Sequence, residues 1–109
     1  TALEVVAAGI VRRIPPREAS DFIAQLPSEL HESLLDLPAG PDRNISLDTI
    51  RSELAARLDI EREPAAKLLY DVGLALRRLV NPGELEHVLT QLPVDMRDVL
   101  PDAVDHPTP

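Results

Sequence analysis

The chain has 109 residues, of which 44% are hydrophobic, 28% are charged and only 2% are aromatic, and its formal net charge is −8. A chain of this length and composition folds around one hydrophobic core. Nucleic acid and anionic membranes are disfavoured as partners because both would face an acidic surface. The lack of cysteine excludes disulfide bonds, a thiolate nucleophile and cysteine-ligated zinc. It also fits a location in the reducing cytoplasm.

The first part of the chain predicts three helices and a loop. Apolar residues from Leu3 to Ile14 recur at helical spacing and predict a helix over residues 1–14. Pro15 ends this helix and Pro16 opens the next, because proline disfavours a helical residue before it but is accepted at a first helical position. Pro27 starts a third, short helix. Residues 37–46 contain two prolines and a glycine, which predicts a linker.

The second part predicts four more helices. Ser46 is suited to cap a helix over residues 47–58, and a long amphipathic helix then runs to about Val80. Asn81 is the expected cap of the next helix, with Glu84 completing a capping box. Pro93 restarts the chain in a last short helix, and residues 103–109 are expected to form a flexible tail.

The sequence repeats itself at an offset of 66 residues. Residues 1–36 then align with residues 67–102 without a gap, and the apolar positions of the helices coincide. The identical pairs include Leu3 and Leu69, Val6 and Val72, Arg12 and Arg78, Pro16 and Pro82, Glu18 and Glu84, Gln25-Leu26-Pro27 and Gln91-Leu92-Pro93, and Asp36 and Asp102.

This duplication predicts an all-α fold of seven helices in two pseudo-symmetric tandem repeats, about 1–36 and 47–102, within a single domain of residues 1–102. The second repeat has an extra leading helix at residues 47–58. Its counterpart in the first repeat would lie before Thr1, and the sequence lacks it. Because the first residue is Thr and not Met, we expect that the chain has been trimmed or belongs to something longer.

Several of these elements resemble one known family. Both halves share a long amphipathic helix, a helix start with proline and glutamate, and a Gln-Leu-Pro restart at residues 25–27 and 91–93. In these features the chain resembles the bacterial family catalogued as domain of unknown function 2267, over residues 2–100. The resemblance implies an all-helical, soluble bacterial protein and no known activity.

Two patterns are compatible with catalysis or metal binding, but each has a simpler explanation. Glu84 and His87 form the Glu-x-x-His pair of di-iron bundles, yet Glu84 is placed to cap its helix, so they are weak metal candidates and no cofactor is expected. His31, Ser33 and Asp36 share one short helix, whereas a catalytic triad converges from separate elements. The sequence therefore predicts a non-enzymatic protein.

Other repeated polar residues are predicted to have structural roles. The amides of Gln25 and Gln91 are suited to backbone groups freed by the following Leu-Pro. Arg12 and Arg78 lie near helix C-termini, where the helix dipole favours a cation.

The residues that differ between the copies are the candidates for function. Tyr70, Leu74 and Arg77 lie off the core stripe of the long helix, and the first copy has Glu4, Ala8 and Val11 instead. Either the helix at residues 47–58 covers them, which we favour because the longest helix is often central, or they bind a partner.

From these residues we expect an interaction or regulatory module that binds a protein partner or self-associates. The alternative is a helical bundle that binds a metal or a small ligand.

Overall fold

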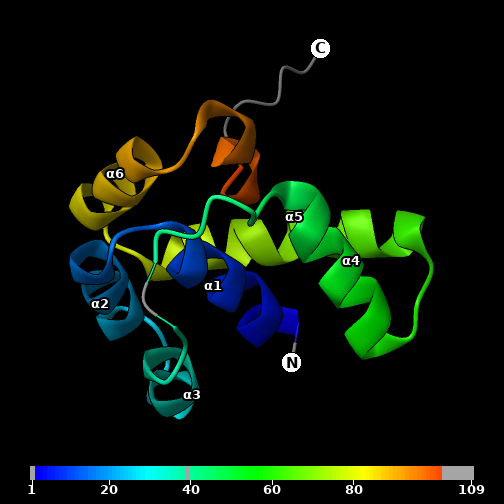
Figure 1. Ribbon diagram of the computed structural model, residues 1–109, viewed down its shortest axis with the longest axis horizontal. Helices are drawn as coiled ribbons and strands as arrows, with labels where there is room; N and C mark the ends of the chain where they lie inside the picture. Colours follow the sequence, from blue (N-terminus) through cyan, green and yellow to red (C-terminus); the bar gives the residue numbers. More distant parts are fainter. Residues whose placement is uncertain (1, 39, 102–109) are drawn as a thin grey trace.

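Helices make up all the regular structure of residues 2–38 and 40–101, which are the residues that the computed structural model describes (Figure 1). The prediction of an all-α fold is confirmed. The predicted tail at residues 103–109 lies outside the described residues. The elements are α1 (Ala2–Arg13), α2 (Pro16–Ala24), the 3₁₀ turn η1 (Ser28–Leu30) that leads directly into α3 (His31–Leu35), α4 (Leu47–Leu58), α5 (Arg62–Leu79), α6 (Pro82–Gln91) and the 3₁₀ helix η2 (Val94–Val99).

Proline sets the start of two helices. Pro16 is the first residue of α2 and Pro82 the first of α6, as predicted. Asn81 caps α6, because its side-chain oxygen accepts a hydrogen bond of 2.9 Å from the backbone N–H of Glu84. The carboxylate of Glu84 makes no return hydrogen bond to the Asn81 backbone. The predicted capping box at this helix is therefore only half formed.

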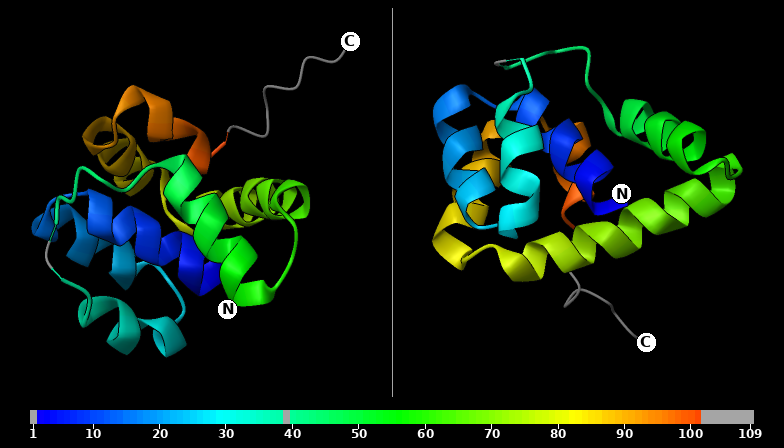
Figure 2. Two further views of the ribbon diagram at one scale, coloured as in Figure 1. Left: turned by 45° about the vertical axis from the view of Figure 1, so that its right-hand side comes forward. Right: turned by 90° about the horizontal axis from the view of Figure 1, so that it is seen from below.

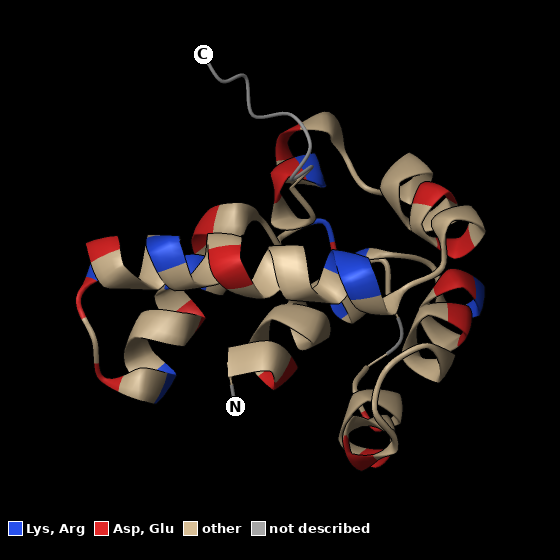
Figure 3. Cartoon of the chain, turned by 180° about the vertical axis from the view of Figure 1, so that it is seen from behind, with Lys and Arg blue, Asp and Glu red and all other residues tan. Residues whose placement is uncertain are grey.

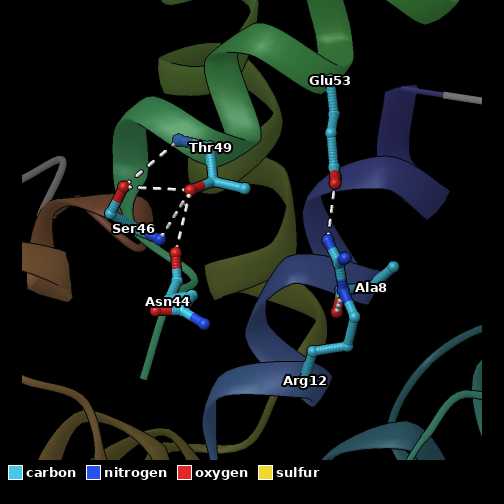
Figure 4. Close-up of polar contacts among 6 residues, drawn as sticks. All are labelled: Ala8, Arg12, Asn44, Ser46, Thr49 and Glu53. Atoms are coloured by element: carbon cyan, nitrogen blue, oxygen red, sulfur yellow. Dashed lines mark hydrogen bonds and ion pairs between the residues drawn. The ribbon is translucent and has the colours of Figure 1, made fainter. Parts of the chain in front are cut away.

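A complete capping box starts α4 instead (Figure 4). The Thr49 N–H donates to the Ser46 hydroxyl at 3.2 Å, and the Ser46 N–H donates to the Thr49 hydroxyl at 3.1 Å. At its other end α4 stops at Asp59, whose backbone is left-handed with φ of 54°. This short turn brings the chain back so that α5 packs against α4.

The most enclosed helix is α1, which contacts α2, α3, α4 and α5 (Figure 2). Its buried residues point in nearly every direction around the helix axis: Val5, Val6, Ala7, Gly9, Ile10 and Val11. In contrast, the buried residues of the longer α5 lie on one side only. The expectation that the longest helix is central, with the helix at residues 47–58 covering Tyr70, is therefore wrong, because Tyr70 is 41% exposed. α4 packs on α1 as well as on α5, and its contact with α1 makes α1 the central helix.

A single aliphatic core forms among these helices. Phe22 is its one aromatic member, and Leu26 and Leu92 are buried at the ends of α2 and α6. The other core side chains that are almost fully buried are Ile10, Ile14, Leu34, Ile50, Leu54, Leu76, Met96, Leu100, Val6, Val88 and Val99.

Among the described residues, no helix has both the length and the apolarity needed to cross a bilayer.

The helix boundaries agree with the predicted duplication at several points. At the 66-residue offset the ends of α1 and α5 coincide, as do the starts of α2 and α6 and the starts of η1 and η2. α1 also packs on α5, and α2 packs on α6. The last short helix differs, because the first copy continues into α3 whereas η2 is 3₁₀ throughout. Superposition of the two copies stays a prediction.

Candidate partner-binding face

The outer face of α5, opposite its core side, is uncovered over much of its length. Seen from behind, α5 runs across the molecule with no other helix in front of it (Figure 3). Its core side is formed by Ala65, Leu69, Gly73 and Leu76. The exposed residues along the central and C-terminal part of the other side are Tyr70, Asp71, Ala75, Arg78 and Leu79.

Tyr70 lies beside α4 and not under it. Its side chain is 41% exposed and borders a groove of about 420 Å³ that is also lined by Leu47 and Arg51 of α4. Asp98 and Pro101 also line this groove. The aromatic ring is thus open to a binding partner.

Leu74 is half-buried, one helical turn after Tyr70. Unlike Leu68 and Val72 of the same helix, it is not among the side chains that pack against the core of the described residues. Tyr70 and Leu74 together form an apolar strip on a face that also carries Asp71 and Arg78.

Arg77 has a contact inside the molecule. Its guanidinium donates a hydrogen bond of 2.8 Å to the backbone carbonyl of Leu100, which ties the end of η2 to α5. Its neighbour Arg78 is exposed, and among the described residues it makes no ion pair. The structure therefore gives Arg77 a structural role and makes Arg78 the exposed cation of the face. Helical spacing in the sequence did not predict that the two adjacent arginines have different environments.

The Glu84 carboxylate lies where α6 packs on α2. One of its oxygens has neither solvent contact nor a hydrogen-bond partner. Burial, followed by the negative charge of Asp21, raises the pKa of Glu84; His87 opposes this shift and Glu18 adds to it. Within residues 2–38 and 40–101, no three His, Asp or Glu side chains are placed to hold a metal ion.

The other sequence candidates make local contacts. A ring nitrogen of His31 lies 2.8 Å from the Leu26 carbonyl, and the Ser33 hydroxyl donates to the Leu30 carbonyl at 3.3 Å. These contacts do not join His31 to Ser33.

Gln25 does bind a freed backbone group, although in the other repeat. Its side-chain oxygen accepts from the backbone N–H of Asn81 at 3.3 Å and from the Asn81 amide at 3.1 Å. Gln91 is exposed. The role of Gln25 is therefore structural, because it links the ends of α2 and α5, but its partner is Asn81 and not a backbone group freed by Leu26-Pro27.

Comparison with known proteins supports the family resemblance that the Gln-Leu-Pro elements indicate. No curated protein and no solved structure matches the chain. The model of a family described as "Uncharacterized conserved protein (DUF2267)" matches residues 1–99. Because this match covers most of the 109 residues, the chain belongs to the DUF2267 family of uncharacterised conserved proteins.

Proposed function

We propose that this chain is a non-enzymatic interaction module of a bacterial cytoplasmic protein, and that it binds a protein partner at the outer face of α5. The exposure of Tyr70 carries the proposal, because this large ring is 41% exposed on the side of α5 that faces away from the core. Tyrosine and arginine are the residue types that most often anchor interfaces. Leu74 and Arg78 follow Tyr70 at intervals of four residues, so the three side chains form one strip along the helix.

We propose a non-enzymatic function because the candidate catalytic side chains do not converge. His31 and Ser33, which could act as a base and a nucleophile, are each directed to a backbone carbonyl. A catalytic site needs such groups to converge on one reacting atom.

The proposal is tested by capture of partners from an extract of the native host. The immobilised chain is compared with its Leu74→Glu variant, which places a charge in the apolar strip. The matched control is Leu35→Glu, because Leu35 of α3 is 60% exposed and lies outside α5. Leucine and glutamate have similar helix propensities, so both variants should fold. A melt followed by circular dichroism checks this.

We expect wild type and Leu35→Glu to capture the same partner and Leu74→Glu to lose it. Capture that is unchanged in Leu74→Glu would contradict the proposal. Capture lost only in Leu35→Glu would move the binding site to α3, where Leu35 borders an apolar groove together with Leu34 and Leu37.

A further inference from the structure

The groove beside Tyr70 has walls from three elements that contact one another, α4, α5 and η2. Its volume of about 420 Å³ lies in the range of small-molecule binding sites, and its lining is largely apolar, as is usual for such sites. The apolar lining residues are Leu47 of α4, Ala66 and Leu69 of α5, and Pro101 near the end of η2.

Contacts within the molecule hold these walls in place. A complete capping box fixes the first turn of α4, which carries Leu47. Arg77 of α5 donates to the Leu100 carbonyl at 2.8 Å. A Cβ atom at Gly73 of α5 would overlap the Val99 carbonyl, so η2 lies directly on α5. The groove is therefore built into the fold.

Arg51 of α4 is the cation of this groove. Its side chain is half-buried, and none of the ion pairs or side-chain hydrogen bonds within residues 2–38 and 40–101 involves it. Asp48, the acid one turn earlier on the same helix, pairs with Arg62 instead. A guanidinium presents its donors as a planar fork that matches a carboxylate. Arg51 thus offers the groove donors that no group in the described residues uses.

The other two polar residues of the groove restrict the charge of a ligand. Tyr70 has a hydroxyl that can donate a hydrogen bond and an exposed ring that offers an apolar surface. Asp98 is exposed, and its negative charge repels a ligand that carries two negative charges. A single carboxylate on an apolar body fits these groups, whereas a phosphate dianion does not.

We propose that the groove between α4, α5 and η2 binds a small carboxylic acid in its ionised form, with the carboxylate on Arg51 and the apolar body against Leu69 and Tyr70. This inference goes beyond the proposed function, because it concerns a small molecule and not a protein partner. Tyr70 borders both sites, but the groove includes neither Leu74 nor Arg78. Either proposal can therefore fail while the other holds.

The experiment titrates phenylbutyrate into the full chain labelled with ¹⁵N. Phenylbutyramide is the control ligand, because it keeps the apolar body and loses the charge. Phenyl phosphate tests a dianion, and acetyl-glycyl-phenylalanine tests a carboxylate at the end of a peptide. The amide signals show where each compound binds. Fluorescence reports binding independently, because Tyr70 is the one tyrosine of a chain without tryptophan.

Three variants test the roles of the charged groups. Arg51→Met removes the guanidinium and keeps an unbranched side chain. Its matched control is Arg57→Met, because Arg57 is exposed on the same helix and does not line the groove. Asp98→Asn removes the negative charge of the groove. A melt followed by circular dichroism checks that each variant is folded.

We expect phenylbutyrate to bind with a Kd on the order of 1 mM, as is usual for a ligand of this size. The amide control and Arg51→Met should each weaken binding by about tenfold, since each loses hydrogen bonds between charged groups. Arg57→Met should bind as the wild type does. Asp98→Asn should strengthen binding by roughly twofold, and such a gain cannot come from a general loss of structure.

Equal binding of the acid and the amide would overturn the inference, as would a folded Arg51→Met variant that binds phenylbutyrate like the wild type. Amide shifts that lie outside α4, α5 and η2, or no shifts at all, would also contradict it. Tighter binding of phenyl phosphate would show that the ligand class is wrong. Tighter binding of the peptide would show that the ligand is the C-terminus of a protein and not a small molecule.

Discussion

Leu26 and Leu92 follow the last turns of α2 and α6 and precede the prolines that restart the chain. Both side chains are buried, at 5% and 2% exposure. Truncating either residue to alanine should lower the free energy of unfolding by about 2–5 kcal/mol, because the vacated volume is only partly refilled. Urea denaturation measures the loss. If one substitution leaves the free energy of unfolding unchanged and the other lowers it strongly, the two leucines do not have equivalent roles in a duplicated fold.

Glu84 should make stability depend on pH. Its folded-state pKa is raised above the ordinary value of 4.5, mainly by burial and by Asp21. The folded protein therefore holds this proton more tightly than the unfolded chain, and the group destabilises the fold once it ionises. Glu84→Gln should accordingly unfold at a higher temperature than wild type at pH 7. The difference should shrink as the pH falls toward 4.5.

The control for this experiment is Glu86→Gln. Glu86 is exposed on the same helix, so its replacement changes the net charge equally. If both variants gain the same stability at pH 7, the effect belongs to the overall charge of −8 and not to the buried oxygen of Glu84.

Among the elements, α4 depends on a close approach to α1 at Gly9. Alanine is the better helix former by about 1 kcal/mol, yet Gly9→Ala should destabilise the protein by about 1–3 kcal/mol. The reason is that the new Cβ would overlap the side chain of Ile50, which is fully buried. Chemical denaturation measures the change.

A second substitution tests this explanation. Ile50→Ala removes the atoms that the new Cβ would meet, so Gly9→Ala should cost much less in that background than in wild type. Equal costs in the two backgrounds would show that the α1–α4 contact is not the cause.

The sequence predicts the helices well because their ends are set locally. Pro16, Pro82, Ser46 and Asn81 each act on neighbouring backbone groups, and each begins or caps a helix as expected. The central position of α1 was not predictable in this way. It follows from where α4 lies, which depends on contacts between residues about 40 apart, such as Arg12 with Glu53.

The proposed binding face was predictable only in part for the same reason. Comparison of the two copies singles out Tyr70 and Leu74, but the sequence favours their burial under α4, whereas Tyr70 is 41% exposed. The comparison does not distinguish Arg77 from Arg78, because the difference is a hydrogen bond to Leu100, 23 residues away. Helical spacing says which side a residue faces, but not what the chain later brings to that side.

At the scale of the whole molecule, charge predicts what the protein does not bind. Basic residues lie among acidic ones along the chain (Figure 3), and the net charge is −8. We expect no binding of duplex or single-stranded nucleic acid at physiological salt, since such binding needs a basic patch that releases counterions. Fluorescence anisotropy with labelled oligonucleotides tests this, and a salt-dependent affinity would contradict it.

The most direct test of the proposed binding face is hydrogen–deuterium exchange of the chain with and without a partner captured from the host extract. A partner on the outer face of α5 should slow exchange in the peptides that cover Tyr70 to Arg78, because it shields that helix and suppresses its local opening. Peptides covering α3 should be unchanged. Protection confined to α3, or to the contact between α2 and α6, with none in α5, would contradict the assignment of α5 as the binding element.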